Sequence, residues 1–121
     1  MPTKFIQNMN KTEAGFHLLV ILSLADGSLQ KAESEVILEF LDEHFREPIE
    51  IIKEQAFLKA CPMEELPNHF TETAERFYAI SSSDERNELI EFAMKVVMAD
   101  RKMEKTENSY INMLFDCWGL D

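Results

Sequence analysis

Glycine and proline are scarce in this sequence of 121 residues, which contains three Gly and four Pro. All-β proteins with many short strands need these residues in their turns, and long disordered linkers are enriched in them. The shortage therefore argues against both classes. At this length the chain is expected to form one domain over residues 1–121.

Cysteine is also scarce, and long apolar runs are lacking. Cys61 and Cys117 do not form a CxxC pair and are too few for a disulfide framework, so both are expected to be reduced, partly buried thiols. The longest apolar run, Leu18–Leu22, is far too short to span a bilayer. Residues 1–13 lack the apolar core and the cleavage site of a signal peptide. We therefore expect a cytoplasmic protein that does not insert into membranes.

Basic residues are outnumbered almost two to one. The chain has 12 Lys and Arg against 23 Asp and Glu, and its formal net charge is −11. Such a surface repels phosphate backbones and anionic lipids, so no nucleic-acid partner is expected. Cations and proteins with a basic or apolar surface are the natural partners. The oligomeric state does not follow from the sequence.

Apolar residues, in contrast, are abundant, and they recur at helical spacing in most of the chain. Helices are predicted over residues 13–25, 31–45, 48–60, 67–80, 82–99 and 105–118. In the helix over residues 31–45, the apolar side chains of Val36, Ile37, Phe40 and Leu41 are expected to face inward. The segment between Pro62 and the fourth helix is expected to form one short turn. The fold class is therefore all-α, a compact bundle of about six or seven helices.

Several helix boundaries carry recognisable end signals. Thr12 is predicted to cap the first helix, and Ser82 with Glu85 forms a capping-box pattern at the start of another. Pro48 is expected in the first turn of the third helix. Gly119 is a suitable terminator for the last helix.

A ten-residue pattern occurs twice. The segment LADGSLQKAE begins at Leu24 and the segment MADRKMEKTE begins at Met98, and in each an Asp is followed seven positions later by a Glu. Each copy is predicted to form the tight turn of a helical hairpin, because the flanking segments are helical. The two pseudo-repeated hairpins are expected to pack against each other.

The acids of these turns, Asp26, Glu33, Asp100 and Glu107, are predicted to lie at the margin of apolar helix faces. An ionised carboxylate there needs hydrogen bonds, a counter-charge or a metal ion. One interpretation is that the acids staple the turns by accepting hydrogen bonds from backbone amides. The other is that they bind a divalent cation, and oxygen ligands without His or Cys favour Ca²⁺ or Mg²⁺. The calcium-loop pattern of EF-hands is absent.

At these turns the sequence resembles the TerB-like family, which is named for tellurite resistance. Members of that family are all-helical domains in which an acidic turn of ADG type, followed by a Glu, occurs twice. The resemblance covers most of the chain, from about Glu13 to Trp118. It implies a compact helical domain with clustered acids that have been proposed to bind metal. It also implies a role in cytoplasmic stress-response systems, or as a module in larger proteins.

The family motif falls on Asp26, Gly27 and Glu33 in the first turn and on Asp100 and Glu107 in the second. Arg101 stands where the family pattern has Gly. A left-handed backbone at Arg101 would cost roughly 1–2 kcal/mol, and its guanidinium can neutralise the neighbouring acids. The first turn is therefore expected to contribute more to any site than the second.

Catalytic groups are not evident. His17, His44 and His69 fall on three different predicted helices without a shared spacing, so we expect solvated histidines or histidines at the edge of the core, without a metal-binding or catalytic role. The chain is therefore expected not to be an enzyme. A metal-assisted hydrolase acting at the four acids is a remote alternative.

Two functional hypotheses follow. The first is a non-enzymatic TerB-like binding module of a stress-response system, with an acidic turn cluster that binds a divalent cation. The second is a protein–protein interaction or adaptor domain without metal, in which the acids act only as turn staples.

Overall fold

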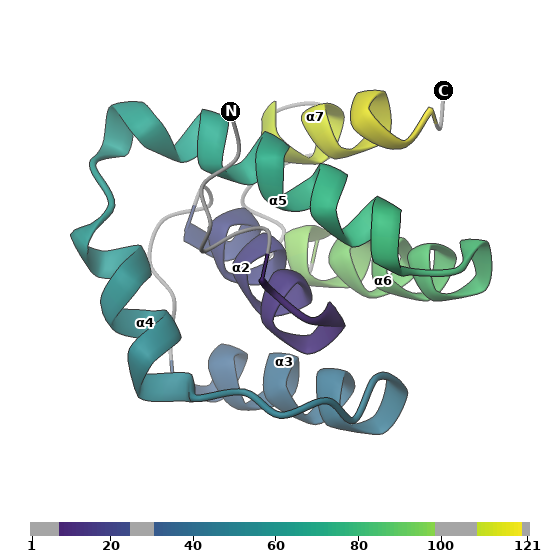
Figure 1. Ribbon diagram of the computed structural model, residues 1–121, viewed down its shortest axis with the longest axis horizontal. Helices are drawn as coiled ribbons and strands as arrows, with labels where there is room; N and C mark the ends of the chain where they lie inside the picture. The colour runs from purple at the N-terminus through teal and green to yellow at the C-terminus, as the bar shows by residue number, and fades with distance from the viewer. Residues whose placement is uncertain (1–7, 25–30, 99–108, 120–121) are drawn as a thin grey trace.

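The structure, a computed structural model, describes residues 8–24, 31–98 and 109–119. Within these ranges it contains only helices and their connections, and no strand (Figure 1). The elements are α2 (Lys11–Leu24), α3 (Lys31–His44), α4 (Ile51–Ala60), the short 3₁₀ helix η1 (Met63–Glu65), α5 (Leu66–Ile80), α6 (Ser83–Met98) and α7 (Ser109–Trp118). The predicted all-α fold class is confirmed. None of the described helices is long and apolar enough to cross a membrane.

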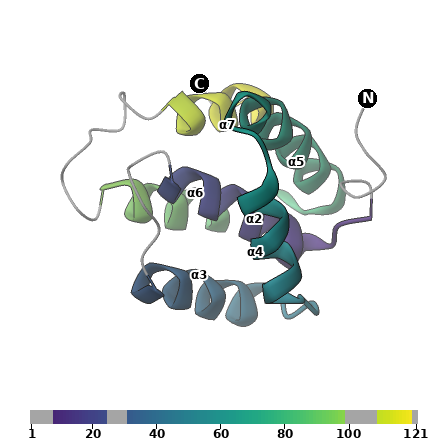
Figure 2. The same cartoon turned by 90° about the vertical axis from the view of Figure 1, so that its left-hand side faces the viewer.

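Helix α2 runs through the middle of the bundle. Every side chain from Phe16 to Leu22 is at most 3% exposed. Neighbours reach it from several directions, since α3, α5 and α6 pack against it and α4 and α7 also touch it (Figures 1 and 2). Removing this much apolar surface from water, at about 25 cal/mol per Å², is the main source of stability for such a core. The sequence of this segment is apolar on most sides of the helix, and its surroundings explain that pattern.

Gly15 lies where α2 packs tightly against α3. A Cβ atom built on Gly15 would lie 2.8 Å from Leu41 Cδ2, and the ring of Phe45 and the side chain of Leu89 would follow at 3.6 and 3.7 Å. A methyl group at this position would overlap Leu41, which is fully buried. The absence of a side chain at Gly15 therefore allows α3 to pack closely on α2.

Aromatic contacts join the outer helices in pairs. Between α5 and α7, the indole N–H of Trp118 donates to the carbonyl of Ala74 at 2.9 Å, and the Trp118 ring stacks on Phe77. Between α3 and α6, Phe40 stacks on Phe92 with ring centroids 4.2 Å apart. Because α2 contacts α3, α6 and α7, the helices that flank the two predicted turns meet through α2.

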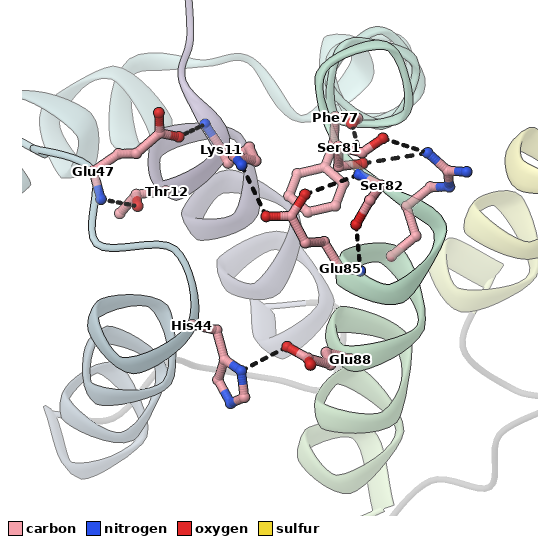
Figure 3. A network of polar contacts seen from close by, with 10 residues as sticks. Lys11, Thr12, His44, Glu47, Phe77, Ser81, Ser82, Glu85 and Glu88 are labelled. Atoms are coloured by element: carbon pink, nitrogen blue, oxygen red, sulfur yellow. Dashed lines mark hydrogen bonds and ion pairs between the residues drawn. The ribbon is translucent and has the colours of Figure 1, made fainter.

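The cap of α2 differs from the prediction. Helix α2 begins at Lys11, and Asn10 caps it: the Glu13 amide donates to Asn10 Oδ1 at 2.8 Å, and the Asn10 amide donates to Glu13 Oε1 at 2.9 Å. The prediction of Thr12 as the cap was wrong, because Asn10 and Glu13 have the spacing of a reciprocal capping box. The Thr12 hydroxyl instead accepts a hydrogen bond from the Glu47 amide (Figure 3).

The predicted capping box at the start of α6 is present. The Ser82 amide donates to Glu85 Oε1 at 2.8 Å, and the Glu85 amide donates to Ser82 Oγ at 3.2 Å (Figure 3). Lys11 adds a 2.8 Å ion pair to the other oxygen of Glu85. Partial burial alone would raise the pKa of Glu85, but the bonds from Lys11 and Ser82 lower it. This capping box therefore also ties α6 to α2.

Two further predictions were wrong, and both concern α3 or the segment that follows it. Pro48 is not in a helix, because α4 begins at Ile51 and Glu50 before it is extended. The Pro48 carbonyl instead accepts a hydrogen bond from the Asn10 side chain, which attaches this segment to the start of α2. Val36 is half exposed rather than inward-facing.

The expectation for the two cysteines is met, because Cys61 and Cys117 are free and partly buried.

We expect Gly15→Ala to destabilise the protein by up to about 2 kcal/mol. Overpacking against Leu41 costs about 1–3 kcal/mol, which exceeds the gain of about 1 kcal/mol in helix propensity. In a Leu41→Ala background the obstructing atoms are absent, so Gly15→Ala should be neutral or stabilising. Urea unfolding of the four proteins measures this coupling. Equal effects of Gly15→Ala in both backgrounds would contradict the close contact.

Candidate functional site

The predicted acidic residues fall mostly outside the described part of the chain. This holds for Asp26, Asp100 and Glu107, while Glu33 lies in the first turn of α3, where only its backbone is described. The neighbouring helix ends are described. The C-terminal ends of α2 and α6 and the N-terminal ends of α3 and α7 lie on the same side of the bundle, at the left of Figure 2.

A second group of polar side chains lies inside the bundle, where α2, α4 and α5 meet. His17 Nε2 is 2.6 Å from Glu54 Oε1, and His17 Nδ1 is 2.8 Å from His69 Nε2. The three residues are 0%, 2% and 7% exposed, respectively. We call this group, formed by His17, Glu54 and His69, the buried cluster.

Each helix supplies its member of the buried cluster from a buried face. His17 follows Phe16 on the central helix, and His69 precedes Phe70 on α5. On α4 the buried residues are Glu54 and Leu58, which are one helical turn apart, whereas Ile52 is 84% exposed. Helix α4 thus turns a carboxyl group toward the core and an isoleucine toward solvent.

The hydrogen-bond pattern limits how protons are distributed over the buried cluster. Both ring nitrogens of His17 have an ionisable partner, so at least one proton must lie on each of the two short contacts. One shared proton in addition to two neutral imidazoles and an ionised Glu54 gives the cluster zero net charge. That distribution costs the least to bury. When this proton resides on Glu54 or His17, His69 is neutral and accepts at Nε2.

The surroundings of His69 keep it neutral. Its pKa is lowered from 6.5 to about 4, mainly by burial and also by the positive charge of His17, while Glu54 partly counteracts these effects. The ring of Phe57 lies beside both imidazoles, with its centroid 5.0 Å from that of His69 and 5.7 Å from that of His17. An apolar ring in this position shields the hydrogen bonds from water.

The buried cluster has the residue types of a metal site, but its geometry is different. A metal–nitrogen bond is about 2.0–2.1 Å, so two imidazoles on a tetrahedral ion stand about 3.3 Å apart. The nitrogens of His17 and His69 are 2.8 Å apart, which is a hydrogen-bond distance. Among the described residues, no three or more His, Cys, Asp or Glu side chains are arranged to hold a metal ion. The described arrangement can share and transfer a proton.

The sequence-based view of the histidines was right for one of the three. His44 is exposed and forms a 2.6 Å pair with Glu88 of α6 (Figure 3). The prediction was wrong for His17 and His69, which are buried and bonded to each other across 52 positions of sequence. Spacing cannot reveal such a contact. A signal was nevertheless present, because His17 interrupts an apolar segment and a buried polar group needs a partner.

The fold and the site together define a small all-helical domain, with a buried central helix and two acidic sequence motifs between its helices. The chain belongs to the TerB family, since residues 12–121 match the family described as tellurite resistance protein TerB. The resemblance seen in the sequence is thereby confirmed. Searches for similar curated proteins and for similar solved structures return no match.

Two histidine–glutamate pairs of equal length allow a test of burial. We expect Glu54→Ala to destabilise the protein by about 3–5 kcal/mol, because His17 would lose its buried partner. Glu88→Ala removes an exposed partner at the same 2.6 Å distance and should cost less than about 1 kcal/mol. Urea unfolding at neutral pH measures both values. Similar costs for the two variants would mean that the buried pair contributes no more than the exposed one.

Acid should weaken the fold through His69. Its ordinary pKa of 6.5 applies to the unfolded chain, which therefore binds more protons than the folded chain between pH 6.5 and about 4. Stability should fall as the pH decreases through this window, by on the order of 2–3 kcal/mol. Urea unfolding from pH 7.5 to 4.5 measures the loss. His69→Gln cannot titrate and should show a smaller loss, whereas an equal loss would assign the effect to carboxylates.

Proposed function

We propose that this chain is a non-enzymatic binding domain whose acids Asp26, Glu33, Asp100 and Glu107 bind a divalent cation, Ca²⁺ or Mg²⁺. One observation supports this most directly: the described helix ends that flank the two acidic motifs lie on one side of the bundle (Figure 2). Acids from both motifs can therefore contribute to one site. The family resemblance supports it as well, because clustered acids of this family have been proposed to bind metal.

The local electrostatics agree with this proposal. The N-terminal end of α3 carries a partial positive charge, which favours an ionised Glu33 in its first turn. The C-terminal ends of α2 and α6 present carbonyl groups with partial negative charge on the same side. The net charge of −11 raises the concentration of cations around the whole surface. In this proposal the domain acts in the cytoplasm in a stress response; the family name, which refers to tellurite resistance, supports the stress-response part.

The second candidate is a docking domain without an ion, and the outward face of α4 favours it. Ile52 is 84% exposed and Ile51 is 36% exposed, with exposed Lys53 beside them. An apolar face of this kind suits a protein partner. The four acids would then only staple their turns. A metal-assisted hydrolase, the remote alternative, needs the same ion as the first candidate.

Titration with Ca²⁺, Mg²⁺ and Zn²⁺, followed by NMR, tests the proposal. We expect amide shifts confined to the four acids and their neighbours, saturating with Ca²⁺ or Mg²⁺. Asp26→Asn should weaken binding more than Asp100→Asn, because Arg101 already offsets part of the second carboxylate's charge. Glu88→Gln, an exposed acid of α6 outside the proposed site, is the control and should leave binding unchanged.

The opposite results support the docking domain. A spectrum that does not respond to any of the three ions would overturn the cation proposal. In that case Asp100→Asn should be the more destabilising variant, by roughly 1–3 kcal/mol, since it would break a charge-assisted bond to Arg101. Thermal melts of both variants with and without divalent ions provide this comparison.

A further inference from the structure

Few buried side chains hold α4 in place. Its main packing partner is α2, its buried residues are Glu54 and Leu58, and the Phe57 ring also contacts His69 of α5. Figure 1 shows α4 at the left margin of the bundle, and in Figure 2, where that side faces the viewer, α4 lies in front of α2. The apolar attachment of α4 comes from buried Leu58 and half-buried Phe57, and the hydrogen bond of Glu54 to His17 adds a buried polar contact.

The buried cluster links three helices in series. Glu54 joins α4 to His17 of α2, and His17 joins this pair to His69 of α5. A change of protonation at His69 is therefore felt at α4 through one intervening imidazole. The charged groups that act on His69 are His17 from α2 and Glu54 from α4.

The buried cluster cannot take up a further proton at low cost while α4 is packed against α2, which we call the closed state. With one shared proton the three groups have zero net charge. A second proton, on whichever group it resides, leaves an uncompensated positive charge in a site that is at most 7% exposed. If it resides on His69 while His17 is charged, two N–H groups face each other across 2.8 Å. Opening of α4 relieves both penalties, because water can then solvate the charge.

We propose that the buried cluster is a pH-sensitive latch, which holds α4 against α2 and α5 while it carries one shared proton and releases α4 when it takes a second proton from solvent. The bond that breaks is the hydrogen bond between Glu54 and His17, and no covalent bond changes. Release of α4 leaves the rest of the bundle folded. This inference is independent of the proposed cation site.

Hydrogen exchange of single amides, measured by NMR between pH 7.5 and 5 and corrected for intrinsic exchange rates, tests the latch. The opening equilibrium of α4 should rise roughly 30-fold over this range, as linkage gives for a histidine with a pKa of about 4 when closed and 6.5 when open. Amides in the middle of α2 and α5 exchange through global unfolding, so they should stay far better protected than those of α4 at every pH. Equal protection in α2, α4 and α5 would mean that α4 opens only by global unfolding and would overturn the proposal, as would pH-independent exchange of α4.

Two glutamine variants sharpen the test. His69→Gln keeps a side-chain acceptor for His17 but cannot titrate, so the rise in α4 opening should shrink to less than about threefold. His44→Gln removes the exposed histidine and should keep the full rise. A full rise in His69→Gln refutes the latch. If His69→Gln does not fold, ring signals of the wild type decide, because His69 titration and α4 amide exchange must then share one midpoint.

Discussion

Burial of α2 on all sides is the constraint on which the other features of the structure depend. A helix in this position stabilises the bundle through its apolar surface, but its buried polar side chains, Thr12, His17 and Ser23, are out of reach of water. Such groups need hydrogen-bond partners on neighbouring elements. Thr12 accepts a hydrogen bond from Glu47 in the segment before α4, and His17 is bonded to both Glu54 and His69. The hydroxyl of Ser23 has no partner among the described residues.

The orientation of α4 follows from this constraint. Packing by hydrophobicity alone would turn Ile52 inward and Glu54 outward, and the observed helix does the reverse. An imidazole inside an apolar helix explains the difference, because an unpaired buried histidine is more costly than an exposed isoleucine. The polar contact therefore selects the face of α4, and the isoleucines that remain outside are available to a partner. A single polar residue of the central helix thus determines which apolar surface the domain exposes.

Local patterns predicted much of the fold, and non-local contacts account for what they missed. Helical periodicity placed the six α-helices of the described residues, and the capping box of Ser82 and Glu85 was found because both residues belong to one turn. The error at Thr12 arose because Asn10 and Thr12 are both possible caps of α2. Asn10 forms the cap, while the Thr12 hydroxyl accepts a hydrogen bond from the amide of Glu47, 35 residues away. The buried cluster joins residues 37 and 52 positions apart, so no spacing rule could propose it. The role of the four acids of the repeated motifs, as cation ligands or as turn staples, stays a prediction.

The acidity of the chain and its buried carboxyl group are connected. Most of the 23 acids can be solvated at the surface, where their mutual repulsion is screened by salt. Glu54 is buried and has no such screening, and among the described residues its hydrogen-bond partner is His17. A surface with net charge −11 attracts protons as well as metal cations, so it favours proton uptake by any histidine that becomes exposed. The same excess of acid that attracts a cation to the surface therefore also favours the open state of the buried cluster, and added salt weakens both effects.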